Sequence, residues 1–210
     1  MIQHTQWLPM DIQESTWDER SLIRQAKVDA NAFGPLYDRY YARVYTYLYR
    51  RCGHDTLAED LTADTFLKAM RGMPSYKNGK APFLGWLYRI AHNCLISHYR
   101  KEKVRELFGI NQRKDKEIGS PAKPNTIQAM DMDIAGHRIS DLISLLNSRD
   151  QFILSLRYFE DVSIKDIAAI MGTSVTAART NLHRALQRLR TKIQREAPEL
   201  ESLIDGRAST

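Results

Sequence analysis

The feature that most constrains this chain is a short apolar segment, a tight turn and a long basic segment between residues 163 and 190. Residues 164–170 carry apolar side chains at helical spacing, and Gly172 then supplies the left-handed turn that a close helix–helix corner requires. Ser174 stands where it can cap the next helix. This order is typical of a helix-turn-helix, in which the second helix enters the major groove and the first braces it. The sequence therefore predicts DNA as a partner.

Basic residues gather in two blocks of this 210-residue chain, whose formal net charge is +6. Residues 22–104 hold 14 basic and 7 acidic residues, and residues 137–195 hold 10 and 5. The segment between the blocks is neutral, and both ends of the chain are acidic. Two basic blocks indicate two domains that face nucleic acid, although an ordinary solvated surface would give a similar charge distribution.

The compartment follows from what the sequence lacks. Cys52 and Cys94 are too few for a disulfide framework, so a reducing environment is expected. The N-terminal residues have no charged start followed by an apolar run, as a signal peptide would. No stretch approaches the ~18 apolar residues of a membrane span. We therefore expect a cytoplasmic protein without membrane contact.

Apolar residues recurring every three and four positions predict an all-α fold. Helical patterning is expected over residues 21–51, 57–71, 83–103, 139–147, 149–159, 164–170 and 174–195, with Gly53 as a C-cap. The helical pattern is lost between residues 105 and 136, where Gly and Pro lie among mixed charges. The predicted organisation is an acidic extension (1–20), a helical domain (21–104), a flexible linker (105–136), a helix-turn-helix domain (137–195) and an acidic tail (196–210).

Two motifs in the first domain point to a family. Residues 57–69 read Leu-Ala-Glu-Asp-Leu-Thr-Ala-Asp-Thr-Phe-Leu-Lys-Ala, and residues 82–93 read Pro-Phe-Leu-Gly-Trp-Leu-Tyr-Arg-Ile-Ala-His-Asn. Both resemble the signature of the extracytoplasmic-function (ECF) sigma factors, and the resemblance resumes over residues 141–192. It implies a two-domain initiation factor, not an enzyme, that needs no cofactor. Such a factor directs core RNA polymerase to promoters by recognising the −35 element and melting the −10 element.

One charged face of the helix over residues 57–71 carries Asp60, Asp64 and Lys68, four residues apart, beside apolar side chains. Alone, this pattern is more typical of a solvated charged stripe than of a binding face. The resemblance implies that the face binds the clamp helices in the largest subunit of core RNA polymerase. The residues expected to make this contact are Glu59, Asp60, Leu61, Asp64 and Phe66.

The resemblance also implies that the helix over 83–103 and the loop before it open the −10 element and hold a flipped base. Aromatic faces replace lost base stacking, at ~1–3 kcal/mol per base, while basic side chains follow the phosphates. The residues expected at this strand are Tyr76, Lys77, Asn78, Lys80, Trp86, Arg89, Asn93, Ser97 and Arg100. Tyr76 is the favoured base contact because its loop is polar, whereas Trp86 could equally pack in the core. The tyrosines between residues 37 and 49 are expected to pack between helices.

The helix over 174–195 is expected to read the −35 duplex with its N-terminal residues. Residues placed at base edges are Thr176, Ala177, Arg179, Thr180 and Asn181, and Arg179 is best suited to pair with guanine. Ser174, at the start of the helix, is also expected to contact the −35 DNA. Arg184 and Arg188 lie further along, where phosphates are expected. The family commonly has Gly-Thr-Val-Lys-Ser-Arg where this chain has Thr-Ala-Ala-Arg-Thr-Asn, ending at Asn181. This difference bears on which −35 DNA sequence the helix recognises, and not on its mode of binding.

Two other classes of protein stay open. A stand-alone helix-turn-helix repressor or activator would need no polymerase, but it would leave the loop and aromatic helix of the first domain without a role. A nuclease or recombinase would need carboxylates around metal ions, or a nucleophile next to a base. His92, Cys94 and His98 do not complete the four ligands of a tetrahedral metal site, so no metal is expected. Family members are commonly inhibited by an anti-sigma protein, which this sequence does not identify.

Overall fold

The computed structural model describes residues 18–77, 81–108 and 142–198, and every regular element within these residues is helical. The first half of the chain contains α1 (Glu19–Val28), a 3-10 turn (Ala30–Phe33), α2 (Gly34–Cys52), α3 (Asp55–Gly72), a second 3-10 turn (Met73–Ser75) and α4 (Phe83–Leu107). The second half contains α6 (Ser148–Tyr158), α7 (Ile164–Met171) and α8 (Val175–Glu196). The all-α prediction is confirmed. Most of the proposed extension, linker and tail lies outside the described residues, although α1 begins at Glu19 and α4 continues to Leu107.

The helical segment expected over residues 21–51 is two helices, because the chain turns at Asp29. This residue is extended, with φ −130° and ψ 114°, and its carboxylate accepts a hydrogen bond from the backbone N of Asn31 at 2.9 Å. Pro35 then lies in the first turn of α2, where its missing N–H breaks no helical hydrogen bond. Gly53 ends α2 with a φ of 64°, as the sequence predicts. The turn lets α1 fold back beside the second 3-10 turn.

The tyrosines of α2 that follow the exposed Tyr37 fall into two sets. Tyr40 and Tyr47 are buried, as expected for packing between helices. Tyr41, Tyr45 and Tyr49 are only half-buried and stack along the helix at four-residue spacing, with ring centroids 6.2 and 5.9 Å apart. The expectation of helix packing therefore describes the first set fully and the second only in part, because these rings pack on the outside of the core.

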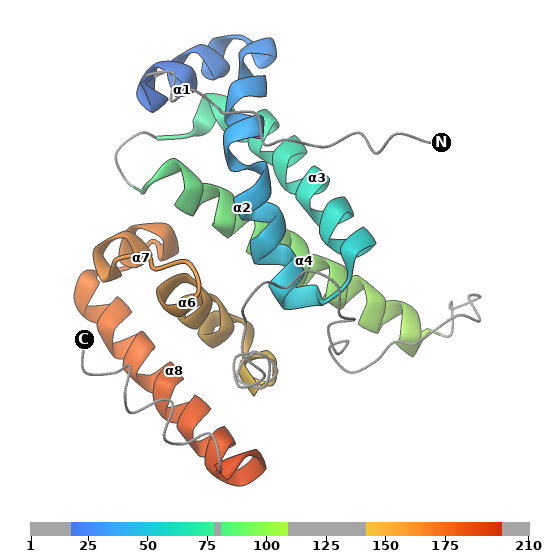
Figure 1. Ribbon diagram of the computed structural model, residues 1–210, viewed down its shortest axis with the longest axis vertical. Helices are drawn as coiled ribbons and strands as arrows, with labels where there is room; N and C mark the ends of the chain where they lie inside the picture. The colour runs from blue at the N-terminus through green and yellow to red at the C-terminus, as the bar shows by residue number, and fades with distance from the viewer. Residues whose placement is uncertain (1–17, 78–80, 109–141, 199–210) are drawn as a thin grey trace, which may run out of the picture.

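The second half has the corner that the sequence predicts. Gly172 has a φ of 66°, in the left-handed region, and Ser174 Oγ accepts the backbone N–H of Ala177 at 3.1 Å. Ser163 caps α7 in the same way. Buried side chains of α6, α7 and α8 form the core of this half. The two halves then lie side by side, with α7 against α4 (Figure 1).

Candidate nucleic-acid and polymerase interfaces

The exposed face of α3 differs from the one that the sequence predicts. Glu59 and Asp60 are exposed as expected, but Leu61 and Phe66 are 5% and 3% exposed. Phe66 packs against aromatic rings of the first half, with its centroid 4.7 Å from that of Tyr37. Both side chains point into the core, so Leu61 and Phe66 do not lie on the surface that α3 exposes here, and their contact with polymerase stays a prediction.

Leu67 is the apolar residue that the exposed face of α3 does offer. Its side chain is 48% exposed, and it lies seven residues, or two turns, after Asp60. Sequence reasoning missed it because a leucine that directly follows Phe66 is expected to be part of the core. The signal that could have identified it is the spacing from Asp60 through the exposed Ala63.

Asp64 lies at the side of this face, next to α4. Its carboxylate accepts a hydrogen bond from Lys68 Nζ at 2.6 Å, and Lys68 Nζ also lies 3.3 Å from Cys94 Sγ. Partial burial acts to raise the pKa of Asp64, but the hydrogen bonds from Lys68 and Cys94 outweigh it and lower this pKa below its usual value. Asp64 is therefore an ionised carboxylate whose charge is already paired within the chain.

The aromatic residues before α4 pack on one another. Tyr76 is 7% exposed, and its hydroxyl donates to the carbonyl of Ala81 at 3.1 Å. Its ring centroid lies 5.4 Å from that of Phe83 and 4.8 Å from that of Trp86. The polar loop suggested an accessible ring, but the ring of Tyr76 is packed against other aromatic rings here, and its contact with a base stays a prediction. Trp86 is half-buried and packs here as well, so the alternative of core packing describes part of its surface.

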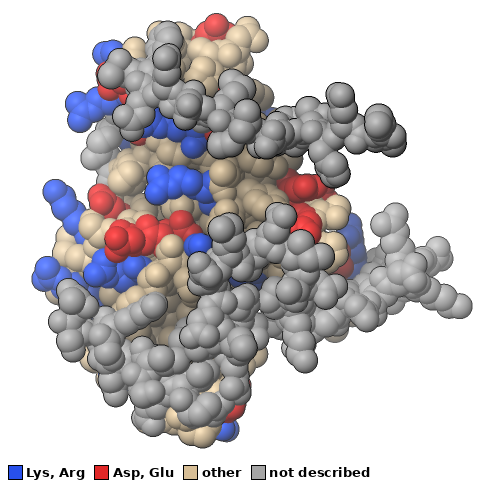
Figure 2. Space-filling view, in the orientation of Figure 1, with Lys and Arg blue, Asp and Glu red and all other residues tan. Residues whose placement is uncertain are grey.

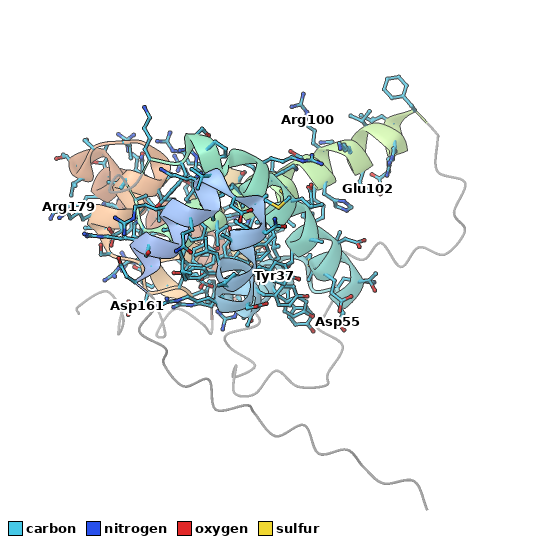
Figure 3. All side chains as sticks on the ribbon, turned by 90° about the horizontal axis from the view of Figure 1, so that it is seen from above. Tyr37, Asp55, Arg100, Glu102, Asp161 and Arg179 are labelled. Atoms are coloured by element: carbon cyan, nitrogen blue, oxygen red, sulfur yellow. The ribbon has the colours of Figure 1, made fainter. Side chains whose placement is uncertain are left out.

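The polar stripe of α4 is exposed along its length, at Arg89, Asn93, Ser97 and Arg100. Arg89 Nη1 donates to the carbonyl of Ile170, in the last turn of α7, at 3.3 Å. Arg100 lies on the part of α4 that projects from the molecule (Figure 3). Lys77 is exposed before this helix, while Asn78 and Lys80 lie outside the described residues.

The N-terminal end of α8 presents the residues that the sequence places at base edges. Thr176, Arg179 and Thr180 are exposed, and Ala177 and Asn181 are half-buried. Arg179 lies at the end of the molecule opposite to Arg100 (Figure 3). The two candidate DNA-contacting surfaces thus belong to different halves. Ser174 is exposed, but its hydroxyl serves as the helix cap.

The two arginines expected at phosphates differ in their partners. Arg184 and Arg188 are exposed and line a groove between α8 and residues 145–147. Arg188 Nη1 lies 2.8 Å from the carboxylate of Asp150, which is buried. Arg188 therefore compensates a buried charge, while Arg184 extends the exposed basic surface.

Acidic and basic side chains alternate across the face shown in Figure 2, where basic groups lie above and below acidic ones. Among the described residues, no three His, Cys, Asp or Glu side chains come together as a metal site would require. No helix in the described ranges combines the length and apolar character needed to cross a bilayer.

Comparison with known proteins identifies both halves. Residues 36–105 match the family described as Sigma-70 region 2, and residues 136–189 match Sigma-70, region 4. The RNA polymerase sigma factor YlaC of Bacillus subtilis (strain 168) is 31% identical over 164 residues, covering 78% of this chain and 93% of YlaC. ECF RNA polymerase sigma factor BldN of Streptomyces coelicolor is 30% identical over 170 residues, covering 80% of this chain and 63% of BldN.

The fold is also that of a solved structure. CnrH, in complex with the cytosolic domain of CnrY, superposes with a TM-score of 0.58 at 21% sequence identity. The match covers 85% of this chain and 98% of CnrH. At this identity the likeness establishes the shared fold.

Proposed function

Since this chain belongs to the ECF sigma factors, which bind core RNA polymerase and promoter DNA to start transcription, we propose that its two halves read different promoter elements. Sigma factors are initiation factors rather than enzymes. Family membership therefore argues against a stand-alone repressor or activator and against a nuclease or recombinase. The observation that carries the proposal is that each half exposes one polar helix face, on α4 and on α8. The proposal assigns the −10 element to α4 and the −35 element to α8.

The core polymerase surface proposed for this chain is the exposed face of α3, made by Glu59, Asp60 and Leu67. Two exposed carboxylates beside an exposed leucine suit a basic, partly apolar partner helix, such as the clamp helices of the largest polymerase subunit. Asp64 contributes at the edge. Leu61 and Phe66 act indirectly, by fixing α3 on the core.

Single-stranded −10 DNA is proposed to follow the stripe from Trp86 through Arg89 to Arg100. Arg89 and Arg100 would meet phosphates, and Asn93 and Ser97 supply hydrogen bonds between them. Lys77, Asn78 and Lys80 would add basic and polar contacts from the preceding loop. Tyr76 supports this surface by packing beneath Trp86.

Duplex −35 DNA is proposed to receive the start of α8. Arg179 would pair with guanine, and Thr176, Ala177, Thr180 and Asn181 lie around it at base-edge positions. Ser174 holds the first turn of the helix in place. Arg184, and Arg188 through the part of its side chain that stays exposed, would meet phosphates.

An inhibitory partner is proposed as well. CnrH was solved with the cytosolic domain of CnrY, and the sigma factor RpoE of Bartonella quintana with the anti-sigma factor NepR. By analogy with these proteins, we infer that this chain binds an anti-sigma protein. We also propose that it acts in the cytoplasm, where core RNA polymerase works.

Transcription in vitro with core polymerase and a promoter library tests the proposal, and Asp60→Arg tests the polymerase surface. Asp60→Arg should weaken polymerase binding at least about tenfold, since a reversed charge meets a like charge across the interface. Glu196→Arg is the matched control, because Glu196 is an exposed acid at the far end of α8. Equal polymerase affinity for the two variants would contradict the assignment of α3.

A further inference from the structure

A groove runs along the C-terminal half of α8, on the side that faces residues 145–147 (Figure 1). Side chains that recur every three or four residues on α8 form one wall: Arg184, Gln187, Arg188, Thr191, Lys192 and Arg195. Residues 145–147 form the other wall. The volume of the groove is about 610 Å³, within the range of about 300–1,000 Å³ that ligand-binding clefts occupy. We call it the α8 groove. Its far end, at Lys192 and Arg195, has no role in the proposed function.

The α8 groove is both basic and apolar. Leu145 lies in its wall with 51% of its surface exposed, so the groove offers an apolar contact. Two of the four cations, Arg188 and Lys192, pair with carboxylates of the second half. The other two, Arg184 and Arg195, form no ion pair with any side chain among the described residues. The groove therefore suits a ligand that carries both carboxylates and apolar side chains.

The segment that follows α8 has the complementary composition. We call residues 199–210 the distal tail. Its acidic residues outnumber its basic residue three to one: Glu199, Glu201 and Asp205 against Arg207. Its large apolar residues are spaced like one face of a helix: Leu200, Leu203 and Ile204. Acidic side chains that flank such a face make it an amphipathic segment, of the kind that binds in a groove through its apolar side.

The chain also leaves α8 close to the groove. Buried residues recur along the second half of α8 every four positions up to Ile193, and Ala197 continues this row at 4% exposed. Ala197 has left the helix, with φ −155° and ψ 62°, while its backbone N–H still donates to the carbonyl of Ile193 at 2.8 Å. The chain therefore stays against its own domain at Ala197, two residues after Arg195, which lines the end of the groove.

The distal tail is long enough to fill the α8 groove. Arg184 and Arg195 are eleven residues apart on α8, which is about 16 Å at about 1.5 Å per residue. The twelve residues of the distal tail span about 18 Å as a helix and up to about 40 Å when extended. A segment tethered this closely has an effective concentration on the order of millimolar at the groove, so a weak contact is enough for it to bind.

We propose that the distal tail binds in the α8 groove of its own chain. Its apolar face contacts Leu145. Because the distal tail starts beside Arg195 and returns along α8, its first two carboxylates lie near Arg195 and the third lies toward Arg184. In this position the distal tail covers Arg184 and competes with DNA phosphates. That consequence rests on the proposed assignment of Arg184 to the −35 duplex, whereas the docking itself does not.

Amide spectra recorded by nuclear magnetic resonance test the docking in the 210-residue chain. The comparison is with a chain that ends at Pro198, which keeps every described helix. Removing the distal tail should shift the amide signals of Leu145, Asn147 and Thr191, which line the groove away from the new end of the chain. A peptide of residues 199–210, added to the shortened chain, should restore these signals. Spectra that agree at residues 145–147 and 184–191 would overturn the proposal.

Leu145→Ser tests the groove without changing any charge. The variant should displace the distal tail, so that its spectrum approaches that of the shortened chain at Asn147 and Thr191. Leu107→Ser is the matched control, since Leu107 is 75% exposed on α4 and lies outside the groove. Leu203→Ser makes the corresponding change within the distal tail, outside the described helices, and should have the same effect as Leu145→Ser.

Binding to DNA measures the consequence of the docking. At low salt, Leu145→Ser should bind a duplex without promoter elements at least about threefold more tightly than Leu107→Ser, because release of the distal tail frees Arg184 for phosphates. Neither variant alters the net charge, so a general electrostatic effect of the acidic segment would leave the two affinities equal. Equal affinities would reject the competition with DNA.

The outcomes separate this inference from the proposed function. Groove signals that stay unchanged in Leu203→Ser would reject the docking. Signals that change with protein concentration would place the distal tail in the groove of a second copy of the chain, which also overturns the proposal. Failure of the wild-type protein to start transcription with core polymerase would instead refute the proposed function, and the amide spectra do not depend on that result.

Discussion

Arg188 on α8 and Asp150 on α6 form an ion pair, 2.8 Å between Nη1 and Oδ2, in which one partner is exposed and the other buried. The side chain of Arg188 is 53% exposed, against 6% for Asp150. Asp150 also accepts a hydrogen bond from Asn147 Nδ2 at 2.6 Å. The ion pair fixes the proposed −35 helix on α6, so a residue that reads as a phosphate contact in the sequence has a structural partner.

Arg188→Ala should destabilise the protein, because it leaves a buried carboxylate without its cation. A fully buried pair broken in this way costs about 3–5 kcal/mol, and the exposure of Arg188 reduces the expected loss to about 1–3 kcal/mol. Urea-induced unfolding measures the change. Arg184→Ala is the control and should stay within about 0.5 kcal/mol of wild type, since no side chain in the described part of the chain forms an ion pair with Arg184. Equal losses for both variants would contradict the structural role of Arg188.

Arg179 and Arg184 should affect DNA binding in different ways. Arg179→Ala should relax base preference at one −35 position, at a cost of about 1–3 kcal/mol. Arg184→Ala should weaken binding to all sequences alike and reduce the slope of log affinity against log salt by about 1. Holoenzyme binding to a set of −35 variants at several salt concentrations measures both. A sequence-selective loss from Arg184→Ala, or unaltered preference in Arg179→Ala, would refute the assignment concerned.

Tyr76 should contribute to the stability of the fold more than to DNA binding. Tyr76→Phe removes only the hydrogen bond to Ala81 and should cost about 1 kcal/mol. Tyr76→Ala removes a buried ring beside Phe83 and Trp86 and should cost about 3–5 kcal/mol. Thermal unfolding of both variants measures these losses and distinguishes a structural role of Tyr76 from a base contact. A Tyr76→Ala variant that unfolds like wild type but fails to open promoters would restore the role that the sequence predicts.

Stability should fall as the pH drops below about 6.5, and His92 should be one cause. Burial lowers the pKa of His92 to about 3 from 6.5, and the nearby Arg51 charge acts in the same direction. Between these values the unfolded chain binds the proton that the folded chain excludes. The contribution of His92 is therefore complete above pH 6.5 and declines by about 1.4 kcal/mol per pH unit as the pH falls toward 3.

The matched variant for this effect is His92→Gln, which keeps a polar side chain without an ionisation in that range. The difference between the two pH profiles isolates His92, which is needed because Glu160 acts in the opposite direction. Burial raises the pKa of Glu160, so its protonation favours the folded state as the pH falls through that value. Chemical denaturation at several pH values between 4.5 and 7 gives both profiles, and parallel profiles would rule out His92 as the source.

Local chemistry predicted most of the helices correctly. Gly53 and Gly172 adopt the left-handed conformation expected at helix ends, and Ser174 caps α8, because these features depend on residues close in sequence. The break at Asp29 was missed, since apolar spacing continues across it in the sequence. The break is visible only in the structure, where the Asp29 carboxylate accepts the backbone N–H of Asn31 and α1 returns toward the second 3-10 turn.

The candidate surfaces were predicted less completely, because a helical pattern gives periodicity without saying which neighbours occupy each side. Glu59, Asp60, Arg179 and Thr180 are exposed as the sequence indicates. The exposed leucine of α3 is Leu67 rather than Leu61, because α2 and α4 pack against α3 and their placement decides which of its leucines is buried.

The sequence by itself determined most of the helices, the helix-turn-helix corner and the family, since each depends on residue order over short distances. Tertiary structure alone decided that Tyr76 is buried, that Arg188 neutralises Asp150 and that α4 packs against α7. These are contacts between residues 5 to 110 positions apart, such as Tyr76 with Ala81 and Arg50 with Glu160. They depend on how the helices stack, because a side chain's partner is set by the surface opposite to it and not by its neighbours along the chain.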